Sequence, residues 1–163
     1  MVNQELQKTQ YNAIIILRLL IGWHFLYEGA IKLFNPNWTA KGYMLSAEGF
    51  AKPVFAWLGT DSLIGTVDFL NILCLVLVGL TLLLGIWERL GALVGIGLLL
   101  LYYLAHPAFP GLDQAGTEGS YFIVNKNLIE AAALYVIYLI PTASYFGLGR
   151  LLKPGLTNSI AST

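Results

Sequence analysis

Three long apolar runs without a charged residue constrain the fold of this chain more than any other feature. They cover residues 69–87, 90–112 and 131–149. Each contains close to the roughly 20 apolar residues that a helix needs to cross about 30 Å of hydrocarbon. A fourth stretch, 13–34, is also mostly apolar. Because lipid offers no hydrogen-bond partner to the backbone, segments of this kind cross a membrane as helices.

The sequence therefore predicts an all-α fold, a polytopic membrane four-helix bundle that forms one domain over residues 1–163. The predicted spans are about 12–34, 64–87, 90–106 and 122–146. Composition agrees, since 57% of the residues are hydrophobic and 11% are charged, against about 25% charged residues in soluble domains. The formal net charge is zero, so no nucleic acid partner is expected, and membrane lipid is the expected surrounding.

The connections between the spans are unequal in length. A tight "WERLG" turn joins the second span to the third, whereas the two long loops, about 35–63 and 107–121, are predicted to be extracytoplasmic. Both loops then lie on one face, opposite the tight turn and both termini. Within the first loop, apolar residues recur at helical spacing, although Pro53 must break or start a helix. The spaced residues are Tyr43, Ala47, Phe50, Val54 and Trp57. One or two short interfacial helices are expected there.

The distribution of basic residues predicts the orientation. The side with the termini and the tight turn carries Lys8, Arg89, Arg150 and Lys153, while the other side carries Lys32, Lys41, Lys52 and Lys126. The positive-inside rule favours cytoplasmic termini by a narrow margin. The N-terminal "MVNQELQKTQYN" lacks the basic character of a signal peptide, so the first apolar stretch is expected to be retained as a span.

The first span, "LRLLIGWHFLYEGAIKLF", carries four ionisable residues: Arg18, His24, Glu28 and Lys32. At about 100° per residue they fall within roughly 120° of the helix circumference. A charge at mid-bilayer costs about 2.5–3.5 kcal/mol even on insertion scales, so this stripe is expected to face the bundle interior. Glu28 is too short to reach the membrane surface, and Lys32, four residues later, is its expected partner.

The other spans carry polar residues at the same depth, beneath the long loops. The sequence therefore predicts one shared polar site, with Glu28 and Glu130 as catalytic candidates. The ligand-binding candidates are Arg18, His24, Lys32, Asp68, Asn71, His106 and Asn127. The alternative is that these residues only link helices through hydrogen bonds of about 0.6–2 kcal/mol each. A separate set of small residues predicts close helix packing: Gly79, Gly85, Gly91, Gly95 and Gly97.

A quinone headgroup is the cofactor that this polar site would suit. No haem is predicted, because His24 and His106 lie at different depths, and no metal is predicted, because Cys74 is the only cysteine. Quinone carbonyls require hydrogen-bond donors such as Lys32, His24, His106 or Asn127. A carboxylate such as Glu28 or Glu130 could relay the protons of reduction. The expected wall for the ring and tail consists of Trp23, Phe25, Tyr102 and Tyr103.

Three segments resemble the DoxX/DoxD family of membrane proteins. "LRLLIGWHFLYEGAIKLF" resembles the first helix of the family, and "GLTLLLGIWERLGALVG" resembles its second helix and turn. "GSYFIVNKNLIEAAALYVI" is similar to the last helix, with its Lys-Asn-Leu-x-Glu pattern at Lys126, Asn127, Leu128 and Glu130. The long first loop looks more like the DoxD branch.

The resemblance implies a four-helix bundle in the bacterial cytoplasmic (inner) membrane. One branch supplies the membrane subunit of thiosulfate:quinone oxidoreductase, which works with a second, extracytoplasmic protein subunit. Nothing in this sequence identifies thiosulfate as a substrate. The resemblance therefore implies a membrane subunit of a quinone-linked redox system whose electron donor stays open.

Two other functions stay open at this point. One is a non-catalytic membrane scaffold or assembly factor, whose long loops would bind a partner protein. The other is a small-molecule or ion-coupled transporter. A homo-oligomer also stays open, because one chain cannot reveal residues contributed by a second copy.

Overall fold

The computed structural model describes residues 2–112 and 122–150, with side chains from residue 7 onward. Every regular element in these ranges is helical, which confirms the predicted all-α class. The elements are α1 (Val2–Leu33), α2 (Lys41–Leu45), α3 (Lys52–Leu58), α4 (Ile64–Leu84), α5 (Glu88–Ala105), α6 (Lys126–Leu139) and a short 3₁₀ helix, η1 (Leu148–Arg150). The predicted second loop falls partly outside the described residues.

Three helices are long and apolar enough to cross a membrane: α1 from Gln7 onward, α4 and α5. The chain is therefore a membrane protein by length and composition of its helices. α6 has 14 residues, which gives a length of about 21 Å. It is shorter than the predicted span 122–146, and its length alone does not establish a fourth crossing.

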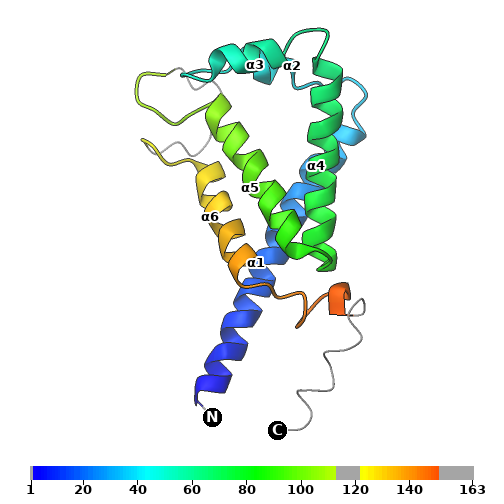
Figure 1. Cartoon of the computed structure of the whole chain (residues 1–163), viewed down its shortest axis with the longest axis vertical. Helices are drawn as coiled ribbons and strands as arrows, with labels where there is room; N and C mark the ends of the chain where they lie inside the picture. Colours follow the sequence, from blue (N-terminus) through cyan, green and yellow to red (C-terminus); the bar gives the residue numbers. More distant parts are fainter. Residues whose placement is uncertain (1, 113–121, 151–163) are drawn as a thin grey trace.

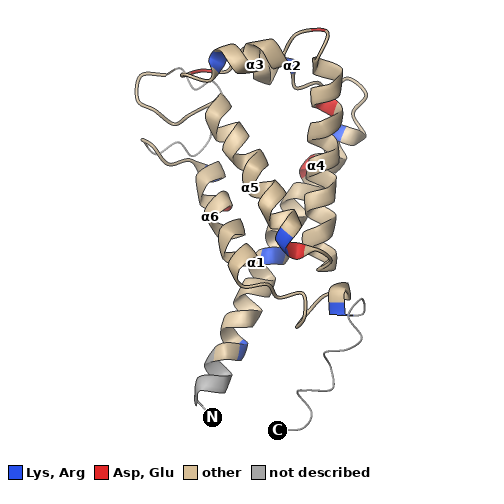
Figure 2. Cartoon of the chain, in the orientation of Figure 1, with Lys and Arg blue, Asp and Glu red and all other residues tan. Residues whose placement is uncertain are grey.

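The four long helices form two pairs that diverge from a common base (Figure 1). α1 packs along α4, α5 packs along α6, and smaller contacts join α4 to α5 and α1 to α6. The end of the bundle at the α4–α5 turn is called the base here, and the opposite end, covered by α2 and α3, is called the loop end. Most charged residues lie towards one of these two ends, as the colours of the ribbon show (Figure 2).

The core between the helices is apolar in its middle third. Phe25, Val78, Leu82, Leu134 and Ile137 are almost fully buried there. A second, smaller cluster lies under the segment 35–63, which we call the roof. Its buried residues include Ala47 and Phe55, which pack near Ala105 at the end of α5. The apolar layer therefore separates the polar groups at the base from those at the loop end.

Local sequence signals explain where the helices start and stop. Gly85 ends α4 in the left-handed conformation, with φ of 64°, which glycine adopts without steric cost. Asn125 caps α6 by accepting a hydrogen bond from the Leu128 backbone N–H. α6 ends just before Pro141, because the residue before proline disfavours the helical conformation. Pro53 lies in the first turn of α3, so it starts this helix as predicted, and α2 and α3 confirm two short helices in the first loop.

Glycine permits the closest helix contacts. A Cβ atom on Gly79 would lie 2.5 Å from the Leu26 backbone nitrogen, and Cβ atoms on Gly91 and Gly95 would also meet neighbouring side chains. The close-packing prediction is confirmed at these positions. It is wrong for Gly97, where a Cβ would meet nothing within 4 Å. Gly97 lies on the opposite side of α5 from the core.

We predict that Gly79→Ala lowers the stability of the protein in detergent by about 1–3 kcal/mol, the range for overpacking a well-packed core. The added methyl group would push α1 away from α4. Gly97→Ala is the matched control, and its effect should be neutral or stabilising by up to about 1 kcal/mol. Thermal unfolding followed by circular dichroism would compare them, and equal destabilisation by both changes would contradict this packing.

Candidate functional site

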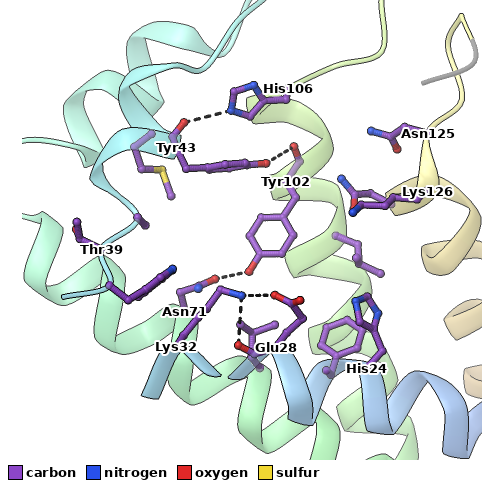
Figure 3. Close-up of a pocket in the computed structure, with 17 residues that line it drawn as sticks. His24, Glu28, Lys32, Thr39, Tyr43, Asn71, Tyr102, His106, Asn125 and Lys126 are labelled. Atoms are coloured by element: carbon purple, nitrogen blue, oxygen red, sulfur yellow. Dashed lines mark hydrogen bonds and ion pairs between the residues drawn. The ribbon is translucent and has the colours of Figure 1, made fainter. Parts of the chain in front are cut away.

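A polar pocket of about 350 Å³ lies between the two helix pairs at the loop end (Figure 3). Side chains from α1, α4, α5 and α6 line its sides, and the first part of the roof covers it. Its polar lining residues are His24, Glu28, Lys32, Thr39, Tyr43, Asn71, Tyr102, His106, Asn125, Lys126 and Asn127. Phe25, Leu75 and Leu99 form its apolar floor, which belongs to the buried core.

α1 contributes an ion pair to one wall of the pocket. Lys32 Nζ donates to a carboxylate oxygen of Glu28 and to the Glu28 backbone oxygen at 3.2 Å. The same Nζ lies 5.7 Å from the ring centroid of Trp38 in the roof, within cation–π range. The predicted partnership of Glu28 and Lys32 is confirmed, and the pair leaves little net charge on this wall.

α4 and α5 contribute the neighbouring wall. The Tyr102 hydroxyl donates to Oδ1 of Asn71, so a tyrosine on α5 and an amide on α4 are joined beside the pocket. Because the side-chain N–H₂ of Asn71 and the Tyr102 oxygen retain hydrogen-bonding capacity, this wall can still interact with a polar ligand.

α6 approaches the pocket with its N-terminal turn. Asn125 and Lys126 lie on the side opposite Lys32 (Figure 3), and Asn127 also lines the pocket. One turn further along, Glu130 Oε1 lies 2.7 Å from Nδ1 of His24 on α1. This bond bridges α1 and α6 at the rim of the pocket, where the His24 side chain is 48% exposed.

The roof is fastened to α5 through Tyr43 and His106. The Tyr43 hydroxyl donates to the Tyr102 backbone oxygen at 3.1 Å, and His106 Nε2 lies 3.2 Å from the Tyr43 backbone oxygen. The Tyr43 and His106 rings are 4.4 Å apart. Tyr43 is 38% exposed, but its hydroxyl points inward, and this burial raises the pKa of Tyr43 to about 12.

Asp68 fastens the roof to α4 and does not line the pocket. Its Oδ1 accepts a hydrogen bond from the Ala40 backbone N–H at 2.7 Å. Lys41, the next residue, forms an ion pair with Asp61 on the surface, and this hydrogen bond lowers the pKa of Asp61. The roof is therefore attached to both helix pairs, through α4 on one side and α5 on the other.

Arg18 lies at the base, away from the pocket in which the sequence predicted it. It precedes His24 by six residues, which separates the two by about 9 Å along α1. Its Nη1 lies 3.1 Å from Glu88 Oε2 and donates to Thr142 Oγ1 at 2.9 Å. Both charged side chains are buried, with exposures of 0% and 2%. The prediction that Arg18 joins the polar site was wrong because a closer acid, Glu88, faces it.

Most of the predicted ligand-binding residues do come together. The pocket is lined by His24, Lys32, Asn71, His106 and Asn127 together with the catalytic candidate Glu28. Glu130 reaches the rim through His24. Of the predicted aromatic wall, Phe25 and Tyr102 line the pocket, whereas Trp23 is 61% exposed and the Tyr103 hydroxyl donates to the Ile123 backbone oxygen.

Sequence reasoning missed the roof residues of the pocket and the partner of Arg18. Trp38 and Tyr43 lie in the roof and line the pocket, although neither was among the predicted site residues. The signal for Tyr43 was its position one helical turn before Ala47, a buried residue of the same apolar stripe. Glu88 could have been recognised as the partner of Arg18, because it is an acid at the base end of α5 and lies at the same depth as Arg18 on α1.

The helices define an α-helical membrane protein with a polar pocket between its long helices. Residues 13–107, more than half of the chain, match the sequence profile of the DoxX family. The chain therefore belongs to the DoxX family. The match covers α4, α5, the roof and the apolar part of α1, and α6 lies outside it. Searches of curated proteins and of solved structures give no match.

We predict that Tyr43→Phe lowers stability by about 1 kcal/mol at pH 8, the usual net value of one hydrogen bond. Since folding raises the pKa of Tyr43 from 10.0 to about 12, its contribution is fully present below pH 10 and is lost as the pH rises through 12. The melting temperature of the wild type should therefore fall more steeply than that of Tyr43→Phe between pH 10 and 12.

Tyr27→Phe is the matched control for this change. Tyr27 is on the exposed surface of α1, and its hydroxyl has no hydrogen bond to another described residue. Its removal should leave both the melting temperature and its pH dependence unchanged. A Tyr43→Phe protein that behaves like Tyr27→Phe would show that the roof is not held by this hydroxyl.

Proposed function

We propose that this DoxX family protein is a membrane subunit of a quinone-linked redox system and that its pocket binds a quinone headgroup. The observation that supports this most directly is the pairing of hydrogen-bond donors on opposite walls of the pocket. Lys32 and Asn71 lie on one side, and Lys126 lies on the other (Figure 3). A flat ring with two opposed carbonyl oxygens is complementary to this arrangement.

The apolar and aromatic parts of the pocket suit the ring. Phe25, Leu75 and Leu99 offer an apolar floor, and Trp38 and Tyr43 offer aromatic faces above it. The volume of about 350 Å³ falls at the lower end of the 300–1,000 Å³ typical of small-molecule sites. A headgroup would fit inside while an isoprenoid tail stayed in lipid.

A bound quinone would accept two electrons and two protons and become a quinol. The residues around the pocket can supply and receive those protons. Glu28 would exchange protons from the wall of α1, and Glu130 would do so through His24, to which it is hydrogen-bonded at 2.7 Å. Lys32, held by Glu28, would orient one carbonyl oxygen and stabilise the negative charge that develops there.

The electron donor would be a second protein subunit bound at the loop end. This side carries the roof, whose Phe50, Val54 and Trp57 are exposed. We further infer a DoxD-like protein of the bacterial cytoplasmic membrane, with four membrane crossings and with both termini in the cytoplasm. Lys8, Arg89 and Arg150 on the base side support this orientation through the positive-inside rule.

Quinone binding to the purified protein in nanodiscs tests the proposal. A short-tailed benzoquinone and a naphthoquinone should quench tryptophan fluorescence, and Trp38→Phe should remove most of the change, since Trp38 lines the pocket. Lys32→Met should weaken binding about 10–100-fold, the value of a hydrogen bond from a charged group of about 1.5–3 kcal/mol.

Lys52→Met is the matched control for Lys32→Met. Lys52 forms an ion pair with Glu48 at the same (i, i+4) spacing, but this pair is on the roof surface outside the pocket. Its loss should leave quinone affinity unchanged. Absence of saturable quenching by either quinone, or equal weakening by both lysine changes, would overturn the proposed function.

A further inference from the structure

The pocket is closed on the side where α4 meets α5. The Tyr102 hydroxyl donates to Asn71 Oδ1 there, and below this bond Leu75 and Leu99, each 3% exposed, belong to the apolar core. Above it, side chains of α4, α5 and the roof form the second apolar cluster, which includes Val67, Leu104, Ala105, Met44 and Phe55. These contacts close this side of the pocket from its floor to the roof.

The opposite side of the pocket, between α1 and α6, is held by much less. Within residues 7–112 and 122–150, the 2.7 Å contact between His24 Nδ1 and Glu130 Oε1 is the one hydrogen bond that joins these two helices. The pocket residues on this side are also the accessible ones. The His24 and Glu28 side chains are 48% and 38% exposed, and Lys126 is exposed. The pocket therefore opens outward between α1 and α6, and we call this its side opening.

The side opening lies at the depth of the hydrocarbon. His24 precedes Leu33, the last residue of α1, by nine residues, or about 14 Å along the helix. The exposed roof residue Thr39, which also lines the pocket, lies instead at the loop end. The pocket thus has one accessible edge near the membrane surface and another well below it.

The surface around the side opening is apolar. On α1, Leu20 and Tyr27 lie within about 60° of His24 around the helix, and their exposures are 64% and 55%. On α6, Ile129 directly precedes Glu130 and is 57% exposed. A hydrogen-bonded polar bridge with apolar neighbours of this kind separates the polar interior of the pocket from lipid.

We propose that the pocket takes a lipid-dissolved amphiphile through the side opening, with its polar headgroup inside and its apolar tail between α1 and α6 against Leu20 and Ile129. The His24–Glu130 bond is then the contact that opens to admit the ligand. This inference rests on the proposed quinone headgroup site and adds to it the entry route and the tail site. A cavity of about 350 Å³ holds a headgroup but not a long tail, so the tail must leave the pocket, and the side opening leads it directly into lipid.

A reducible cross-link across the side opening tests this route. In a Cys74→Ser background, His24→Cys and Glu130→Cys would be joined by a short bis-methanethiosulfonate reagent. Tryptophan quenching in nanodiscs would compare two benzoquinones with the same headgroup, one without a tail and one with a decyl tail. The cross-link should weaken binding of the decyl form by about tenfold or more, because its methylenes would have to leave lipid. The tailless form should bind equally well before and after cross-linking, since it can enter at the loop end.

Reduction of the cross-link is the closest control, because it changes only the connection between the two side chains, and it should restore binding of the decyl form. A second control is the pair Glu48→Cys and Lys52→Cys, which would be cross-linked on the roof surface outside the pocket and should affect neither ligand. Equal binding of the decyl form with and without the His24–Glu130 cross-link would overturn the route. Failure of the wild type to bind either quinone would instead overturn the proposed function.

Photolabelling of the wild type tests the tail site without any substitution. A benzoquinone with a diazirine at the end of its alkyl tail should label Leu20, Tyr27 or Ile129, and excess unlabelled quinone should suppress these adducts. Phe69 on α4 and Leu101 on α5 are the internal controls, because they are similarly exposed, at 64% and 51%, but lie on the other two helices. Suppressible adducts on Phe69 or Leu101, or labelling spread evenly over all four helices, would overturn the proposal.

Discussion

The buried contact between Arg18 and Glu88 determines much of the architecture of this protein. It joins α1, the start of α5 and the segment after α6 at one point of the base. Because the helices are fixed together there, the two pairs can diverge towards the other end without separating. The polar pocket occupies the space between the diverging pairs. The charges that are costly to bury are thus concentrated where they make the most hydrogen bonds.

The same logic governs two acids near the pocket, each of which is placed beside a basic side chain. Glu28 is paired with Lys32 within one helix, and Glu130 is paired with His24 between two helices. Such local neutralisation lets several ionisable groups stay at membrane depth. Hydrogen-bonding groups of these and neighbouring residues line the cavity. The apolar layer beneath isolates these groups from the base.

The sequence predicted the helical class and most of the pocket. Charged side chains within an apolar membrane span must face the interior of the bundle or a cavity, which leaves few possible positions for them. The spacing of His24, Glu28 and Lys32 placed them on one face, and the structure brings that face to the cavity. Helical periodicity shows on which face of a helix a residue lies, but it does not show which residue of another helix lies at the same depth. The assignment of Arg18 to the pocket failed for this reason. The length of α6 was overestimated because apolar composition does not report where backbone hydrogen bonding stops, although Pro141 marks the place. Whether the pocket binds a quinone stays a prediction.

The attachment of the roof to both helix pairs has a consequence for selectivity. Asp68 binds the roof to α4, while Tyr43 binds it to α5. The length of the roof therefore limits how far apart the two helix pairs lie at the loop end. If the cavity binds a ligand as proposed, the size of the molecule that it admits would depend on this connecting segment. A longer or shorter segment would then change that size without replacing a residue of the cavity walls.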